Sequence, residues 1–121
     1  MNAQKARKPK AKAPMLHIEP TLDSGHTLLV LPAEITHAQA TGCLRLLLTA
    51  VLAKKRDCSA VVVDAAPLVR FDSSALAVLV ECRRTVLQAD RRFAVRGMPG
   101  RLAELARLYG VAELLPRDTS A

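Results

Sequence analysis

Two kinds of hydrophobic pattern meet in the middle of the chain. The unbroken apolar run Val61-Val62-Val63 ends at Asp64, and such a run is typical of a strand covered on both faces. A short linker follows. Asp72-Ser73-Ser74 then opens a segment with apolar residues at three- and four-residue spacing: Leu76, Leu79, Val80 and Leu87. These patterns predict a buried strand over residues 60–64 and a helix over residues 73–88, with two hydroxyl side chains at the helix start.

The residues before this stretch predict a hairpin and a first helix. Short strands are expected over residues 16–19 and 27–31, and Asp23-Ser24-Gly25 between them is a turn signal. Thr36 and Gln39 have the spacing of a capping box, with Thr36 as the N-cap. The helix that they open should run to about Lys55. It carries a wide apolar stripe made of Cys43, Leu44, Leu47, Leu48, Val51 and Leu52.

The residues after residue 88 predict a strand, a third helix and a return to the core. Residues 93–95 form a short apolar run. Pro99 suits the first turn of a helix, and Gly110 suits the position just past its end. Residues 111–115 are expected to form a last short strand. The alternation of strands and helices predicts an α/β fold, with a small mixed β-sheet of four to five strands and three or more α-helices packed against it.

Charge is concentrated at the start of the chain. The 121 residues suffice for one compact domain, with a formal net charge of +7. Five cations lie in the first 13 residues and leave +2 for the rest: Lys5, Arg7, Lys8, Lys10 and Lys12. Residues 1–14 are therefore predicted to be a disordered basic tail. Residues 117–121, after Pro116, are predicted to be frayed. The tail either improves solubility or makes weak contact with an anionic membrane or RNA.

The domain itself does not suit specific nucleic-acid binding. Its charge is nearly balanced once the tail is set aside, so the high pI does not indicate a DNA-binding face. The whole chain has no Trp, one Tyr and two Phe, whereas modules that stack bases need exposed rings. No specific nucleic-acid partner is expected.

Several kinds of chemistry are not supported by the spacing of reactive residues. The scattered positions of Cys43, Cys58 and Cys82 indicate reduced thiols in a cytoplasmic protein. No apolar run is long enough to predict a membrane span or a signal peptide. The three histidines have no second ligand at metal spacing. Asp64 and Asp72 more closely resemble a strand end and a helix cap than a catalytic pair. The sequence therefore predicts no enzyme, no cofactor and no metal site.

The Asp72-Ser73-Ser74 motif has two interpretations. In the first, Asp or Ser caps the helix by accepting a hydrogen bond from an early backbone N–H. In the second, an exposed hydroxyl at the same place is phosphorylated, which brings roughly −1.5 to −2 charges to the helix start. From the residues alone, the capping interpretation is favoured over the phosphorylated one.

The segment VVVDAAPLVRFDSSALAVLVECRR resembles the centre of STAS domains, the fold of bacterial anti-sigma-factor antagonists. Members have a hydrophobic strand ending in Asp, a short loop, and then Asp-Ser-Ser/Ala-Gly before a helix. The resemblance covers about residues 15–116 and implies a STAS fold without catalysis of its own. It places the residue that is phosphorylated in the antagonists on Ser73. Ala75 stands where the family usually has Gly.

One branch of the family is more similar. LAELARLYGVAELLP at residues 102–116 resembles the C-terminal segment of the small STAS subunit of the Mla phospholipid-trafficking ABC transporter. This resemblance implies a cytoplasmic subunit, peripheral to the inner membrane, that binds and supports the transporter ATPase. The implied contact surface comprises Phe71, Asp72, Ser73, Ser74 and Ala75, together with Val78 and Arg83 as exposed residues of the helix.

The alternative within the family is an anti-sigma-factor antagonist, whose partner kinase phosphorylates Ser73. The transporter branch often has Thr at this position, which keeps the antagonist hypothesis open. A third hypothesis, nucleic-acid association through the basic tail, predicts binding that falls steeply with salt.

Overall fold

The computed structural model of the chain describes residues 21–23, 26–53 and 60–117, in which strands and helices largely alternate. Their order is β1 (Thr21–Asp23), β2 (His26–Val30), β3 (Glu34–Ile35), α1 (His37–Ala53), β4 (Ala60–Asp64), β5 (Arg70–Phe71), α2 (Ser74–Gln88), β6 (Phe93–Arg96), α3 (Gly100–Leu108) and the 3₁₀ helix η3 (Ala112–Leu114). The predicted basic tail and the predicted strand over residues 16–19 lie outside the described residues.

The main sheet has the strand order β1-β2-β4-β6. The pair β1–β2 is antiparallel, with Asp23 opposite His26, whereas β2–β4 and β4–β6 are parallel. The prediction of a mixed sheet is therefore confirmed. A hairpin is also present between β1 and β2, whereas the strand predicted over residues 16–19 is outside the described residues.

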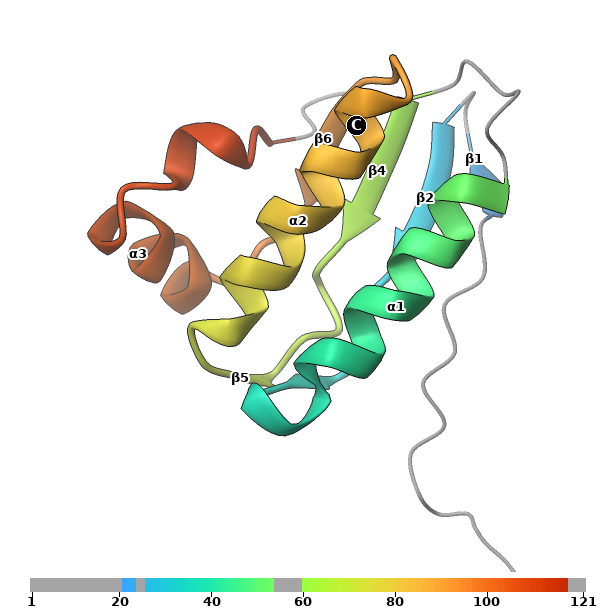
Figure 1. Cartoon of the computed structure of the whole chain (residues 1–121). Helices are drawn as coiled ribbons and strands as arrows, with labels where there is room; N and C mark the ends of the chain where they lie inside the picture. The colour runs from blue at the N-terminus through green and yellow to red at the C-terminus, as the bar shows by residue number, and fades with distance from the viewer. Residues whose placement is uncertain (1–20, 24–25, 54–59, 118–121) are drawn as a thin grey trace, which may run out of the picture.

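The helices bury the apolar side chains of this sheet. Figure 1 shows α1 and α2 side by side across one face of the sheet, with α3 beside α2. Alternate strand residues belong to the core, among them Leu29, Val61, Val63, Phe93 and Val95. Because α2 packs against the sheet and against both other helices, its buried arc is wide: Ala75, Leu76, Val78, Leu79, Cys82 and Val86.

A cation also lies in the interior. The Arg91 side chain is 3% exposed. Its guanidinium donates hydrogen bonds to the Thr27 hydroxyl at 2.7 Å and to the Val51 carbonyl at 3.4 Å. Arg91 thus joins the segment just before β6 to β2 and to the last turns of α1.

The structure has a second, two-stranded sheet that the sequence did not predict. β3 and β5 pair in parallel, with Glu34 opposite Arg70 and Ile35 opposite Phe71. The Arg70 Nε lies 3.5 Å from a Glu34 carboxylate oxygen, but both side chains are exposed, so this ion pair adds little stability. The consequence of the pairing is positional, because it brings the end of the 65–71 linker beside the start of α1.

The end of the chain differs from the predicted last strand over residues 111–115. Gly110, with φ of +73°, ends α3 as expected. The N–H groups of Gly110 and Val111 donate to the carbonyls of Arg107 and Ala106. This Schellman turn leads into η3, so residues 112–114 are helical rather than extended. The chain reaches β6 only afterwards, where the Val95 N–H donates to the Pro116 carbonyl at 2.8 Å and Arg117 forms an isolated bridge with Val95.

Candidate functional site

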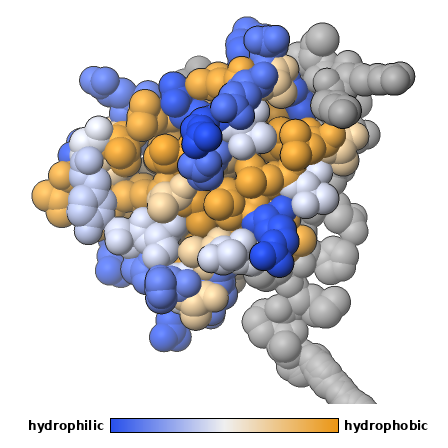
Figure 2. Space-filling model, viewed as in Figure 1, coloured by the Kyte–Doolittle hydropathy of each residue, from blue (hydrophilic) through white to orange (hydrophobic). Residues whose placement is uncertain are grey.

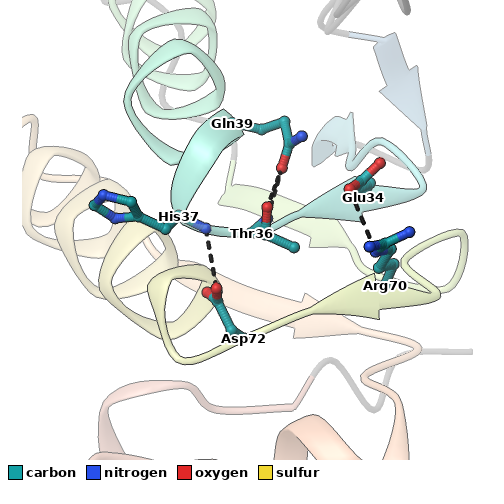
Figure 3. A network of polar contacts seen from close by, with 6 residues as sticks. All are labelled: Glu34, Thr36, His37, Gln39, Arg70 and Asp72. Carbon is teal, nitrogen blue, oxygen red and sulfur yellow. Dashed lines mark hydrogen bonds and ion pairs between the residues drawn. The ribbon is translucent and has the colours of Figure 1, made fainter.

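The Asp72 carboxylate joins the starts of two helices. One carboxylate oxygen accepts a hydrogen bond from the Ser74 N–H at 2.8 Å, and the other accepts one from the His37 N–H at 3.0 Å. Figure 3 shows Asp72 pointing from the β5–α2 turn toward the backbone of His37. The hydrogen bond from Ser74, followed by that from His37, holds the pKa of the Asp72 carboxyl below its ordinary value. The cap predicted at Asp72 is confirmed, and its reach to α1 was not expected.

The start of α1 adds a second polar contact. The Thr36 N–H donates to the Gln39 side-chain oxygen at 2.8 Å, and the Thr36 hydroxyl donates to the same oxygen at 2.6 Å. The predicted capping box is therefore only half formed, because the Thr36 hydroxyl is a donor here and accepts no bond from the Gln39 N–H. The His37 N–H, at the start of α1, has no acceptor within the helix and donates instead to the Asp72 carboxylate.

The two serines of the motif differ in availability. Ser73 is exposed and already has helical backbone angles, with φ of −64° and ψ of −16°, and its side chain makes no capping hydrogen bond. Ser74 is half-buried, and its side chain hydrogen-bonds to the Asp72 carboxylate. Among the described residues, Ser73 is thus the member of the motif whose hydroxyl is left for a partner or a modification.

A shallow groove opens beside this turn. It has a volume of about 320 Å³ and lies between α1 and α2, lined by Ala40, Thr41, Leu44, Ser74, Ala77, Val78 and Glu81. Figure 2 shows apolar surface gathered over these two helices, with polar side chains around it. The α1 side of the groove was missed, although Leu44 belongs to the wide apolar stripe of that helix and would have been the signal.

The remaining predicted site residues do not all share one surface. Ala75 is fully buried and Val78 is 2% exposed, so the expectation that Val78 lies on the exposed face of the helix is wrong. It points between the helices because α2 is packed on three sides. Arg83 is half-buried and lies ten residues beyond Ser73, about 15 Å along the helix axis. Ser73, Ser74 and the groove therefore form the compact part of the site.

Phe71 carries a contact that the sequence did not indicate. The Arg101 guanidinium lies over the Phe71 ring, 6.0 Å from its centre, a distance at which cation–π attraction acts. Phe71 is half-buried, whereas Arg101 is exposed in the first turn of α3. This contact places a cation beside the Asp72-Ser73 turn.

Elsewhere in the described residues, the reactive side chains make local hydrogen bonds or are buried in the core. No group of three or more His, Cys, Asp or Glu that could hold a metal is found in residues 21–23, 26–53 and 60–117. Asp64 accepts a hydrogen bond from the Ala66 N–H at 3.0 Å. Cys43 and Cys82 are buried free thiols, and burial raises their pKa values to about 11 and about 12. Within the same part of the chain, no helix has the length and apolar character needed to cross a bilayer.

Comparison with known proteins gives a family and a fold. A family model described as "Mlab, STAS domain" matches residues 18–116. An anti-sigma-factor antagonist (STAS) domain protein from Planctomyces limnophilus superposes with a TM-score of 0.70 at 19% identity, over 86% of this chain and 91% of that chain. The anti-sigma factor antagonist SpoIIAA in its unphosphorylated form superposes with a TM-score of 0.65 at 13% identity, over 88% of this chain and 90% of that chain. A search of curated proteins finds no significant match.

Proposed function

The chain belongs to the STAS domain family, and on that premise we propose that it is a non-catalytic subunit that binds and supports the ATPase of an ABC transporter for phospholipid trafficking. The observation that carries the proposal is the match of residues 18–116 to the family model whose description names the Mla branch. In this role the chain is cytoplasmic and peripheral to the inner membrane through its partner, and ATP belongs to that partner.

The contact surface is centred on Ser73. Its hydroxyl is exposed and not used by the helix cap, and the apolar groove between α1 and α2 begins next to it at Ser74. An apolar centre with a polar rim is the usual composition of a protein–protein interface. Phe71 and Asp72 complete the surface on the other side of Ser73, and Asp72 contributes mainly by fixing the turn.

Co-purification tests the proposal. The tagged chain is co-expressed with the ATPase and permease of the ABC transporter from the same cell and purified in mild detergent. We expect recovery of both proteins in fixed ratio with the wild-type chain and with Ser73→Ala. Ser73→Glu should lose them, since it adds a larger, charged side chain at the centre of the contact.

The control carries the same change on another surface. Thr49 is exposed on α1 outside the groove, so Thr49→Glu should leave the complex intact. Failure of the wild-type chain to recover the ATPase would contradict the proposal. An intact complex with Ser73→Glu would contradict only the position of the contact.

The exposure of Ser73 favours a second candidate, an anti-sigma-factor antagonist whose partner kinase phosphorylates this residue. Here the wild-type chain should recover a kinase-like anti-sigma factor instead of the ATPase. Mass spectrometry should then find phosphate on Ser73, and Ser73→Ala should retain the partner permanently.

A further inference from the structure

We propose that α3 supplies a second part of the docking surface, in which Arg101 receives a carboxylate of the ATPase and Leu108 packs against an apolar side chain next to it. This inference rests on the proposed function and adds the chemistry of the partner segment. The α3 strip, as we name it, consists of Phe71, Arg101, Leu105 and Leu108.

The strip is continuous with the Ser73 surface. Phe71 is two residues before Ser73, and the Arg101 guanidinium lies 6.0 Å from the centre of the Phe71 ring. Arg101, Leu105 and Leu108 follow at four- and three-residue spacing and so share one face of α3. From Arg101 to Leu108 the face extends about 10 Å along the helix.

The apolar end of the strip is exposed to water. Leu108 is 75% exposed, and the adjacent Tyr109 is 57% exposed. Leu105 is partly buried against the core and links these side chains to it. Leu108 ends α3 and Tyr109 is its C-cap residue. Because both are large apolar side chains at this level of exposure, their burial against a partner would be favourable.

The charge of the strip decides which partner fits. Among the described residues, Arg101 takes part in no ion pair, although Glu104 is close by on the same helix. A cation in the first turn of a helix is also unfavourable to the helix dipole, and the first turn of α3 has no acid to offset it. The charge of Arg101 therefore does not stabilise α3, either through an ion pair or through the helix dipole. A carboxylate brought by a partner would satisfy the guanidinium with two hydrogen bonds while Phe71 holds it in place.

The partner segment is thus an acidic residue flanked by apolar ones, on the surface of the ATPase. A second copy of this chain and an anionic membrane are the other occupants to be tested. Charge complementarity favours the ATPase segment over a second copy, because the strip has no acidic residue of its own and a second strip would offer Arg101 no carboxylate.

Affinity measurements with the purified ATPase test the inference. We expect Arg101→Glu to weaken binding at least about tenfold, with Arg101→Lys intermediate, because Lys lacks the fork of donors. Leu108→Ser should weaken binding about fivefold. Arg101→Glu places an acid in the first turn of α3, where it favours the helix, so we expect this variant to remain folded despite the loss of the contact with Phe71.

Matched controls lie at the opposite end of the sheet. Arg92 is exposed just before β6, and Leu52 is 53% exposed near the end of α1. Arg92→Glu and Leu52→Ser should bind the ATPase like the wild type. A photo-crosslinker at position 108 should label an ATPase peptide that contains Asp or Glu.

The outcomes separate the two proposals. If the wild-type chain does not bind the ATPase, the proposed function fails. If it binds and Arg101→Glu and Leu108→Ser bind equally well, the α3 strip alone is overturned. Concentration-dependent dimerisation lost in Leu108→Ser, or binding to vesicles of anionic phospholipid lost in Arg101→Glu, would also overturn it by assigning the strip to another occupant.

Discussion

Asp72 accepts a hydrogen bond from the backbone N–H of His37 at 3.0 Å, across 35 positions of the chain. Its other oxygen serves Ser74 at the start of α2. One side chain therefore sets the position of two helix starts at the turn that carries Ser73.

Replacing Asp72 should destabilise the domain in a pH-dependent way. Asp72→Ala removes both hydrogen bonds, and Asp72→Asn keeps a weaker acceptor, so Ala should have the larger effect. The folded-state pKa of Asp72 is below its ordinary value of 3.8, so its stabilising contribution is present above that value and is lost as pH falls through the folded pKa. Urea unfolding at pH 7 and at stepwise lower pH should show the difference between wild type and Asp72→Asn shrinking in acid.

The control for this experiment is Asp90→Asn. Asp90 is exposed and has φ of +60°, a conformation that both Asp and Asn tolerate. It should leave the unfolding free energy nearly unchanged at pH 7. An Asp72→Asn difference that stays constant down to pH 2 would contradict the role given to the carboxylate.

Thr27 should stabilise the folded domain by accepting a hydrogen bond from the buried Arg91. Thr27 is 2% exposed, and its hydroxyl accepts a hydrogen bond from Arg91 at 2.7 Å. Thr27→Val keeps the shape but leaves the buried guanidinium with one acceptor fewer, at a cost of about 1–3 kcal/mol in unfolding free energy. Thr49→Val, on the exposed side of α1, should change it by less than ~0.5 kcal/mol. Equal values for the two variants in denaturant titrations would refute the prediction.

Gly97 and Gly110 allow the cost of a left-handed backbone to be measured separately from the cost of steric crowding. Gly97 has φ of +66°, and a Cβ there would lie 2.9 Å from the Ala66 Cβ, whereas Gly110 has φ of +73° and open space around it. Gly110→Ala should cost ~1–2 kcal/mol in unfolding free energy from the left-handed backbone alone. Gly97→Ala should cost a further ~1–3 kcal/mol from overpacking. Gly100→Ala, with open space and an ordinary φ, is the neutral reference in thermal unfolding.

Cys43 and Cys82 should resist alkylation in the folded protein. Both are fully buried, and their pKa values are raised to about 11 and about 12, so the reactive thiolate is scarce at pH 8. Iodoacetamide followed by peptide mapping should find both residues unmodified until denaturant is added. Fast labelling of either thiol in the native protein would show that the α1–α2 interface opens readily.

The sequence sufficed for those parts of the fold that have a long periodic signal. The apolar run at residues 60–64 and the segment opened by Asp72-Ser73-Ser74 correspond to β4 and α2, within one residue at the helix start. β3 and β5 were missed because each has two residues, too few for any period to be visible. Residues 111–115 look like a strand by composition, but the turn after Gly110 directs them into η3.

The candidate site was only partly predictable for a similar reason. The Asp72 cap is local in sequence and was expected, whereas its bond to His37 and the contact of Arg101 with Phe71 depend on how distant segments pack. Val78 was misplaced because a single helix pattern does not reveal how many neighbours surround α2. The predictions for Ser73 and Ser74 as partner-binding residues await the binding experiments.

The strand order of the main sheet has a consequence for synthesis on the ribosome. Because β1, β2, β4 and β6 lie in the sheet in the same order as in the chain, each newly made strand can join an edge that already exists. No later strand has to be inserted between two earlier ones. Growth of the domain can therefore follow translation from the N-terminus, with the last edge completed when residues 116–117 reach Val95.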